Sequence, residues 1–156
     1  MSQTATVPNT AIVILAAGKG TRMRSAVPKV LHEIAGRPML GHVLAASLEA
    51  GASRLCLVTA SGQQEVRDYA LTQVPEISNC IQENQLGTGD AVRAAMSALG
   101  GVARVVIMFG DTPLMRPEML RQLATSEADV CVLGFEPEDA AAYGRIIMEA
   151  DAPARI

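Results

Sequence analysis

A continuous apolar run near the beginning of the chain constrains the fold more than any other feature. Residues 11–16 read AIVILA, and Gly18 and Gly20 follow closely. A strand that is apolar at every position has to be buried on both faces, which is typical of a central strand in a parallel sheet. The whole run, from Ala11 to Ala17, is far too short to span a membrane. We therefore expect the chain to fold around this strand.

Strand-like and helix-like patterns alternate along the rest of the chain. The alternation favours an α/β fold in which helices cover a mostly parallel sheet in three layers. Residues 1–10 are polar and contain a proline, so we expect a flexible leader before one domain at 11–156. Strands are expected at 54–59, 77–82, 104–109 and 129–135, with another beginning near Arg145. Helices are expected at 39–50, 63–71, 88–99, where Thr88 would be the cap, and 117–125.

Composition and charge narrow the possible functions. Hydrophobic residues make up 49% and charged residues 19% of the 156 residues, which suits one folded domain. The aromatic share is only 3%, so the core has to consist of aliphatic side chains. The net charge of −3, without a basic block, argues against a broad nucleic-acid-binding surface. The first ten residues contain no Lys or Arg, so we expect no signal peptide and a cytoplasmic protein without a membrane partner.

The three cysteines show no metal-binding spacing, because no CxxC pair occurs. Cys56 and Cys131 lie inside apolar runs, and Cys80 lies between them in the sequence. We expect free thiols in a reducing compartment, buried at positions 56 and 131. A metal or nucleophile role is the alternative.

Polar clusters follow three of the expected strands at the point where each strand ends. The clusters are AGKGTR at 17–22, QLGTGD at 85–90 and GDTPL at 110–114. The carboxyl ends of parallel strands meet at one edge of the sheet, and ligands of such folds bind there. The coincidence of the three clusters predicts a site at that edge.

The first cluster has the composition of a phosphate-binding loop. Gly18 and Gly20 allow a tight turn whose N–H groups can surround phosphate oxygens. Lys19, Arg22 and Lys29 add three cations, and Lys29 follows a proline that would hold it in an extended segment. The patterns GxxxxGK[ST] and GxGxxG are both absent, so an ordinary strand–helix turn is the alternative.

The other two clusters supply a metal ligand and amide groups. Asp111 ends a strand beside the cationic loop and is a hard oxygen ligand suited to Mg²⁺. Alternatively, Asp111 only turns the chain before Pro113. Gln82 and the turn 87–89 offer donors and acceptors that could read the edge of a pyrimidine. Alternatively, the glycines of this turn only shape the entry into the next helix.

Together these strings resemble the nucleotidyltransferases that activate sugar-1-phosphates. LAAGKGTRMRSAVPKVL at 15–31 matches the family signature LxxGxGTRMxxxxPKxL, and QLGTGDA, GDTPL and YGRI follow in the family's order. The set is most similar to the uridyltransferase domain of the bifunctional enzymes that make UDP-N-acetylglucosamine. The resemblance implies a Rossmann-like nucleotidyltransferase fold, UTP and N-acetylglucosamine-1-phosphate as substrates, Mg²⁺ as cofactor, and a homo-oligomeric full-length protein.

The resemblance also implies roles for individual residues. Arg22 and Lys29 are the catalytic cations: Arg22 and Lys19 hold the pyrophosphate, and Lys29 contacts the α-phosphate. Asp111 binds Mg²⁺, and Gly144 lies against the sugar. The uridine and the rest of the substrate contact Leu15, Ala16, Ala17, Gly18, Gln82, Gly87, Thr88, Phe109 and Gly110.

Two positions depart from the family pattern and leave the sugar specificity open: Asp90 stands where the family has His, and Ala142 where it has Gly. The expected reaction is in-line attack of the sugar phosphate on the α-phosphorus of UTP. One alternative is a transferase with another acceptor, such as a hexose-1-phosphate, molybdopterin or a methylerythritol phosphate. The other is a nucleotide-sugar-binding module without turnover.

The resembled domain continues beyond the position of Ile156 with further sugar-binding residues, a second metal ligand and a β-helix acetyltransferase domain. The resemblance therefore implies a truncated domain. We expect the 156-residue chain alone to bind uridine nucleotides weakly and to form UDP-sugar at no useful rate. An open sheet edge is expected to make it self-associate.

Overall fold

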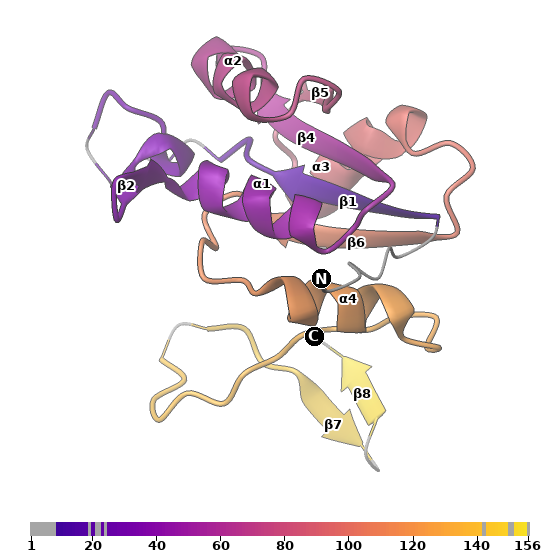
Figure 1. Cartoon of the computed structure of the whole chain (residues 1–156). Coiled ribbons are helices and arrows are strands. Elements are labelled where there is room, and N and C mark those ends of the chain that lie inside the picture. The colour runs from indigo at the N-terminus through magenta and orange to yellow at the C-terminus, as the bar shows by residue number, and fades with distance from the viewer. Residues whose placement is uncertain are drawn as a thin grey trace. The chain divides into compact units, whose positions relative to one another are not determined.

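A four-stranded sheet is the framework of the protein. The computed structural model describes residues 9–18, 20, 23, 25–141, 143–149 and 152–155, which belong to two compact units, Met1–Ser126 and Glu127–Ile156. The sheet of the first unit is parallel throughout, in the order β5-β4-β1-β6 (Figure 1). Its strands are β1 (Thr10–Leu15), β4 (Arg54–Ala60), β5 (Ser78–Gln82) and β6 (Arg104–Phe109). They confirm the strands expected in this part of the chain, with small shifts at their ends.

β1 occupies the interior of the sheet, as the apolar run predicts. All of its residues are buried. Val13 pairs with Cys56 of β4 on one side and with Ile107 of β6 on the other. Because neighbouring strands satisfy its backbone groups on both edges, the strand can bury apolar side chains on both faces.

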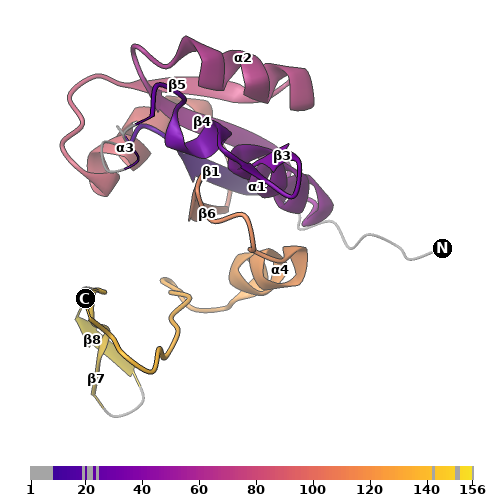
Figure 2. The ribbon, with the colours of Figure 1, turned by 90° about the vertical axis from the view of Figure 1, so that its left-hand side faces the viewer.

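Helices cover both faces of the sheet. α1 (Met39–Glu49), α2 (Gln64–Gln73) and α4 (Pro117–Thr125) pack on one face. α3 (Thr88–Ala95), which continues as the 3-10 helix η3 (Met96–Ala98), packs on the other. Figures 1 and 2 show α1 and α3 on opposite sides of the sheet. The three-layer α/β fold is thereby confirmed.

Alternate residues of β1 divide between two hydrophobic clusters. Ile12 and Ile14 pack with residues of α1, α2 and α4, whereas Val13 packs with residues of α3. Leu44 and Leu57 are fully buried in the larger cluster, and burial of such a side chain contributes roughly 1.5–3 kcal/mol. The buried core of the described residues consists of Ala, Val, Ile, Leu, Met and one Cys side chain, as the composition predicts.

β6 forms one edge of the sheet. Its outer side has no strand partner within the described part of the chain. Val105, Ile107 and Phe109 are 40%, 48% and 47% exposed, because α3 packs on β5, β4 and β1 and does not cover them. An apolar, unpaired edge favours association with another strand, and self-association stays a prediction.

Two local predictions at the ends of loops are wrong. Lys29 is not in an extended segment, because it begins the 3-10 helix η2 (Lys29–Leu31) directly after an extended Pro28. Thr88 is the first residue of α3 and not its cap; the N-cap is Gly87, with a φ of 110°. Glycine adopts this backbone conformation without a steric cost, so the backbone and not a hydroxyl group shapes the helix entry.

A small hairpin leads from η2 into α1. It consists of β2 (Glu33–Ile34) and β3 (Arg37–Pro38), which pair antiparallel. Residues 1–8, most of the expected leader, lie outside the described residues. Among the described residues, no helix is long and apolar enough to cross a membrane.

The second unit contains a hairpin of β7 (Ile147–Glu149) and β8 (Ala152–Arg155). This confirms the strand expected near Arg145. The prediction of a strand at 129–135 is wrong, because the segment is irregular and Val130 is 81% exposed. A strand needs a partner for its backbone groups, and no strand among the described residues pairs with this segment.

The three thiols differ in their environments. Cys56 is buried and Cys80 half-buried, with 3.3 Å between their sulfur atoms. Cys131 is exposed, contrary to expectation, because it lies in the irregular segment 129–135. Burial of Cys56, together with its contact with Cys80, raises the pKa of the Cys56 thiol, which therefore stays protonated at neutral pH.

We expect a thiol reagent to label Cys131 before the other cysteines. At neutral pH, Cys131 should react at least about 100-fold faster than Cys56, because the thiolate is the reactive form and Cys56 is both neutral and shielded. Timed alkylation followed by peptide mass spectrometry measures the order. Cys131→Ser is the control that should remove the fast phase, and fast labelling of Cys56 would contradict the assignment.

Candidate active site

The polar clusters at the carboxyl ends of the strands surround one cavity, which we call the loop cavity. Its volume is about 730 Å³, within the range of small-molecule sites. The loop after β1 contributes to its lining, together with the ends of β5 and β6 and the start of α3. The lining includes Leu15, Ala16, Ala17, Gly18, Gly20, Lys29, Gln82, Gln85, Gly87, Thr88, Phe109 and Asp111.

Most residues that the sequence predicts for the substrate site belong to this lining; that they bind substrate stays a prediction. Gly110 does not line the cavity: a Cβ there would lie 3.2 Å from Val30 Cγ1, so this glycine serves close packing. Gly144 belongs to the second unit, where it is exposed. Lys19 and Arg22 lie outside the described residues.

Lys29 and Asp111 meet in the loop cavity, although 82 positions separate them in the sequence. Lys29 Nζ donates a hydrogen bond to Asp111 Oδ2 at 2.6 Å. The two side chains are 43% and 31% exposed, so the ion pair contributes only about 0–1 kcal/mol to folding. The pair lies at the edge of the sheet where folds of this kind bind ligands.

Gly20 permits the close approach between the loop and Lys29. Its φ of 58° is left-handed, and a Cβ at this position would lie 3.0 Å from Lys29 Cβ. The backbone conformation therefore favours glycine, and the short distance leaves little room for a Cβ. Gly18 has no neighbouring atom within 4 Å of such a Cβ, so of the two glycines only Gly20 is needed for close packing.

Two glutamines to which the sequence assigns no individual role hold the loop after β1. Gln85 Nε2 donates to the Ala17 carbonyl at 2.9 Å. Gln63 Nε2 donates to the Gly18 carbonyl at 3.3 Å, while its Oε1 accepts from the Ala60 N–H at 2.8 Å. These bonds tie the loop to the segments that follow β4 and β5. The only signal in the sequence is an amide side chain soon after each strand.

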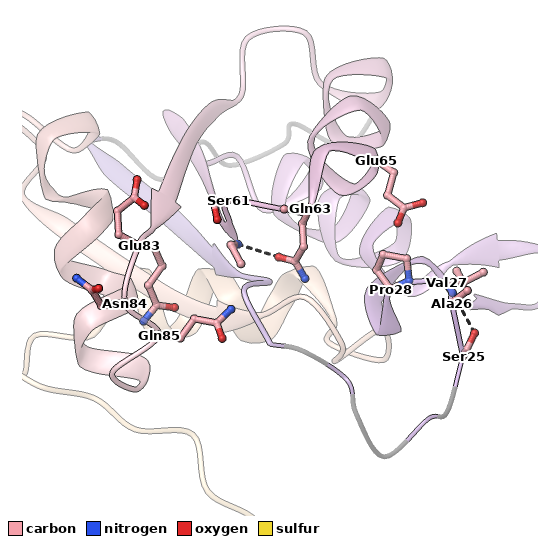
Figure 3. Close-up of a pocket in the computed structure, with 13 residues that line it drawn as sticks. Ser25, Ala26, Val27, Pro28, Ser61, Gln63, Glu65, Glu83, Asn84 and Gln85 are labelled. Carbon is pink, nitrogen blue, oxygen red and sulfur yellow. Dashed lines mark hydrogen bonds between the residues drawn. The ribbon is translucent and has the colours of Figure 1, made fainter.

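A second cavity, of about 660 Å³, lies beside these glutamines (Figure 3). It shares Gln82 and Gln85 with the loop cavity. Its described lining contains the carboxylates of Glu65 and Glu83 but no Lys or Arg, so it is poorly suited to phosphate. The loop cavity, which contains Lys29, is the better candidate for an anionic ligand.

Gln82 is a buried polar residue at the end of β5, only 5% exposed. Its Nε2 donates to the Gly87 carbonyl at 3.0 Å and to Asp90 Oδ2 at 2.8 Å. The Leu86 N–H donates to the same carboxylate oxygen at 3.4 Å. Gln82 and Asp90 thus organise the turn before α3.

Asp111 is the one carboxylate among the described lining residues of the loop cavity. The described part of the chain contains no group of three or more His, Cys, Asp or Glu side chains that could hold a metal. A single carboxylate still suits a hard divalent cation when phosphate oxygens of a ligand complete the coordination. The donor set therefore fits a metal that binds together with a nucleotide.

Comparison with known proteins agrees with this architecture. The bifunctional protein GlmU of Parvibaculum lavamentivorans is 51% identical over 148 residues, which cover 92% of this chain and 33% of the relative. The chain thus spans about a third of that relative's length. Among solved structures, Rv0371C of Mycobacterium tuberculosis H37Rv in complex with manganese matches with a TM-score of 0.60 at 26% identity, covering 74% of this chain and 57% of that one.

A nucleotidyl transferase from Methanothermobacter thermautotroptrophicus has the same fold, with a TM-score of 0.62 at 24% identity over 75% of this chain and 57% of that one. The Rossmann-like nucleotidyltransferase fold is thus confirmed. The family model of the MobA-like NTP transferase domain matches residues 12–148, most of the chain. The chain belongs to the family of MobA-like NTP transferase domains.

Proposed function

We propose that the chain is the nucleotide-binding part of a sugar-1-phosphate uridylyltransferase, which forms UDP-N-acetylglucosamine and pyrophosphate from UTP and N-acetylglucosamine-1-phosphate. One observation carries the proposal: the loop cavity combines the Lys29–Asp111 ion pair with the buried amide of Gln82. The pair offers a cation for phosphate and a carboxylate for a metal, and the amide offers hydrogen bonds to a base. The sequence identity of 51% with a GlmU protein and the four matching motifs support the choice of substrates.

The proposed reaction needs no protein nucleophile. An oxygen of the sugar phosphate attacks the α-phosphorus of UTP, the bond from that phosphorus to the bridging oxygen breaks, and pyrophosphate leaves with the electron pair. The attacking oxygen is already anionic, so no base has to remove a proton from it. Catalysis then consists of positioning the two phosphates and of neutralising their charge.

We assign Lys29, which is among the residues that the structure describes, to the α-phosphate. Its ammonium group is a compact point charge on a flexible stem. Because Lys29 Nζ contacts Asp111 Oδ2, a phosphate at Lys29 and a metal at Asp111 would each replace one partner of the pair. Lys19 and Arg22 remain our proposal for the pyrophosphate.

We assign the metal to Asp111, with Mg²⁺ as the ion. The manganese in the related Rv0371C structure supports a divalent cation. When bound, such an ion would neutralise charge on the phosphates. Asp111 would hold it from the end of β6 together with phosphate oxygens, because the described lining contains no second carboxylate.

The identity of the sugar acceptor, the cellular compartment and the oligomeric state of the protein are further proposals. N-acetylglucosamine-1-phosphate is the proposed acceptor, with Gly144 against the sugar. We propose a cytoplasmic, homo-oligomeric full-length protein, because the GlmU resemblance implies one. A different sugar phosphate, or binding without turnover, remains the alternative that experiment has to separate.

Nucleotide binding and pyrophosphate release test the proposal separately. Calorimetry with Mg²⁺ is expected to show that the chain binds UTP at least about tenfold more tightly than ATP, since the base contributes hydrogen bonds that only a pyrimidine satisfies. The full natural chain is expected to release pyrophosphate from UTP faster with N-acetylglucosamine-1-phosphate than with glucose-1-phosphate. Equal affinity for UTP and ATP would contradict the uridine site, and UTP binding without release with any acceptor would indicate a binding module.

A further inference from the structure

We propose that Asp90 is a positioning residue that fixes the side-chain amide of Gln82 so that the loop cavity selects uracil over cytosine. The inference rests on the proposed uridine site and adds to it a residue that is not part of the described cavity lining. Asp90 lies in the first turn of α3, directly behind Gln82. A carboxylate is favoured there by the helix dipole.

The amide of Gln82 has two N–H donors, and the protein uses both. One contacts the Gly87 carbonyl at 3.0 Å and the other Asp90 Oδ2 at 2.8 Å. Within the described residues, Oε1 of Gln82 has no hydrogen-bond partner, although the residue is 5% exposed and lines the loop cavity. Towards a ligand, Gln82 therefore presents an acceptor and no donor.

Asp90 enforces this orientation because an ionised carboxylate only accepts hydrogen bonds. A flipped Gln82 amide would set its oxygen against the oxygens of both Asp90 and Gly87 and would leave two N–H contacts unmade. The resembled family has His at position 90, and a neutral imidazole can donate as well as accept. The carboxylate of this chain thus restricts the amide more strongly.

The fixed acceptor distinguishes the pyrimidines at their N3 atom. Uracil carries an N3–H between two carbonyl groups, and this donor matches Gln82 Oε1. Cytosine carries an unprotonated N3 whose lone pair would face the same oxygen. A methyl group at C5 leaves the N3–H unchanged, so the selection concerns cytosine and not thymine.

The ratio of affinities for UTP and CTP measures this selection. Asp90→Ala is expected to lower the UTP/CTP ratio about tenfold, the equivalent of one hydrogen bond, and to leave the UTP/5-methyl-UTP ratio unchanged. Asp90→Asn tests the accept-only property: its amide can also donate to a flipped Gln82, so the ratio should fall by about threefold, between the original chain and Asp90→Ala. Asp90→Ser, which suits the first turn of a helix, replaces the alanine variant if that variant does not fold.

A double substitution separates positioning from a structural role. In a Gln82→Met background, Asp90→Ala should no longer change the UTP/CTP ratio, because the group that Asp90 orients is gone. Equal weakening of UTP and CTP by Asp90→Ala, or the same change of the ratio in the Gln82→Met background, would overturn the inference. If the unsubstituted chain bound UTP no more tightly than ATP, the proposed function itself would be overturned.

Discussion

Replacing Asp111 by asparagine is expected to remove most metal-dependent activity and to leave the fold intact. In the full natural chain, pyrophosphate release should fall by at least about 100-fold, because a bound metal contributes several kcal/mol and each ~1.4 kcal/mol is a factor of ten. Thermal stability should change little, because the Lys29–Asp111 pair is 43% and 31% exposed and such pairs contribute about 0–1 kcal/mol. Titration of activity with Mg²⁺, together with a thermal melt, measures both quantities.

Glu118→Gln is the matched control for this substitution. Glu118 forms an ion pair with Arg121 at 3.6 Å on α4 and lines neither cavity. The Glu118→Gln substitution removes a paired carboxylate outside the proposed site, and it should leave activation by the metal unchanged. If Asp111→Asn lowers the melting temperature but keeps normal metal activation, Asp111 is only a turn residue.

Replacing Lys29 by methionine is expected to have two effects of opposite sign. Turnover should fall about 10²–10³-fold, because a preorganised charge near the reacting phosphate is lost. Binding of Mn²⁺ in the absence of nucleotide should become tighter, because the ammonium no longer competes for Asp111 Oδ2, 2.6 Å away. Methionine keeps the apolar stem beside Gly20, so the loop should retain its path.

Electron paramagnetic resonance of free Mn²⁺ measures the second effect, and pyrophosphate release the first. Lys29→Arg keeps the positive charge and should keep Mn²⁺ binding near the original, while its planar guanidinium restores turnover only in part. Unchanged turnover in Lys29→Met would refute the assignment of the α-phosphate. Weaker Mn²⁺ binding would refute competition between Lys29 and the metal.

Most of the fold follows from patterns that are local in the sequence. The apolar run of β1 predicts an interior strand because side chains on both faces have to leave water, and the alternation of strands and helices predicts the layers. The strand expected at 129–135 shows the limit of such patterns. Its residues have the preference for a strand, but a strand also needs a neighbour, and no local pattern supplies one. The expectation that Cys131 is buried is wrong for the same reason, because Cys131 lies in this segment.

The sequence predicts most of the residues that line the loop cavity, but not the contacts between them. Gln82 and Asp111 lie at or just after strand ends, Lys29 begins η2 after the loop that follows β1, and all three line the loop cavity. The ion pair between Lys29 and Asp111 spans 82 positions and depends on the helical turn that was expected to be extended. Gln63 and Gln85 donate hydrogen bonds to backbone carbonyl groups of the loop after β1. A pattern of side chains in the sequence does not show where such carbonyl groups lie.

β1 is synthesised first, but its pairing is completed late. On one edge Thr10 pairs with Arg104 of β6, and on the other Ala11 pairs with Arg54 of β4. On the ribosome, a wholly apolar strand therefore keeps one edge unpaired until β6 has left the exit tunnel. Pairing between segments so distant in sequence slows folding and leaves apolar surface accessible to chaperones in the meantime. We therefore expect β6 to join β1, β4 and β5 after these three strands have paired in the nascent chain.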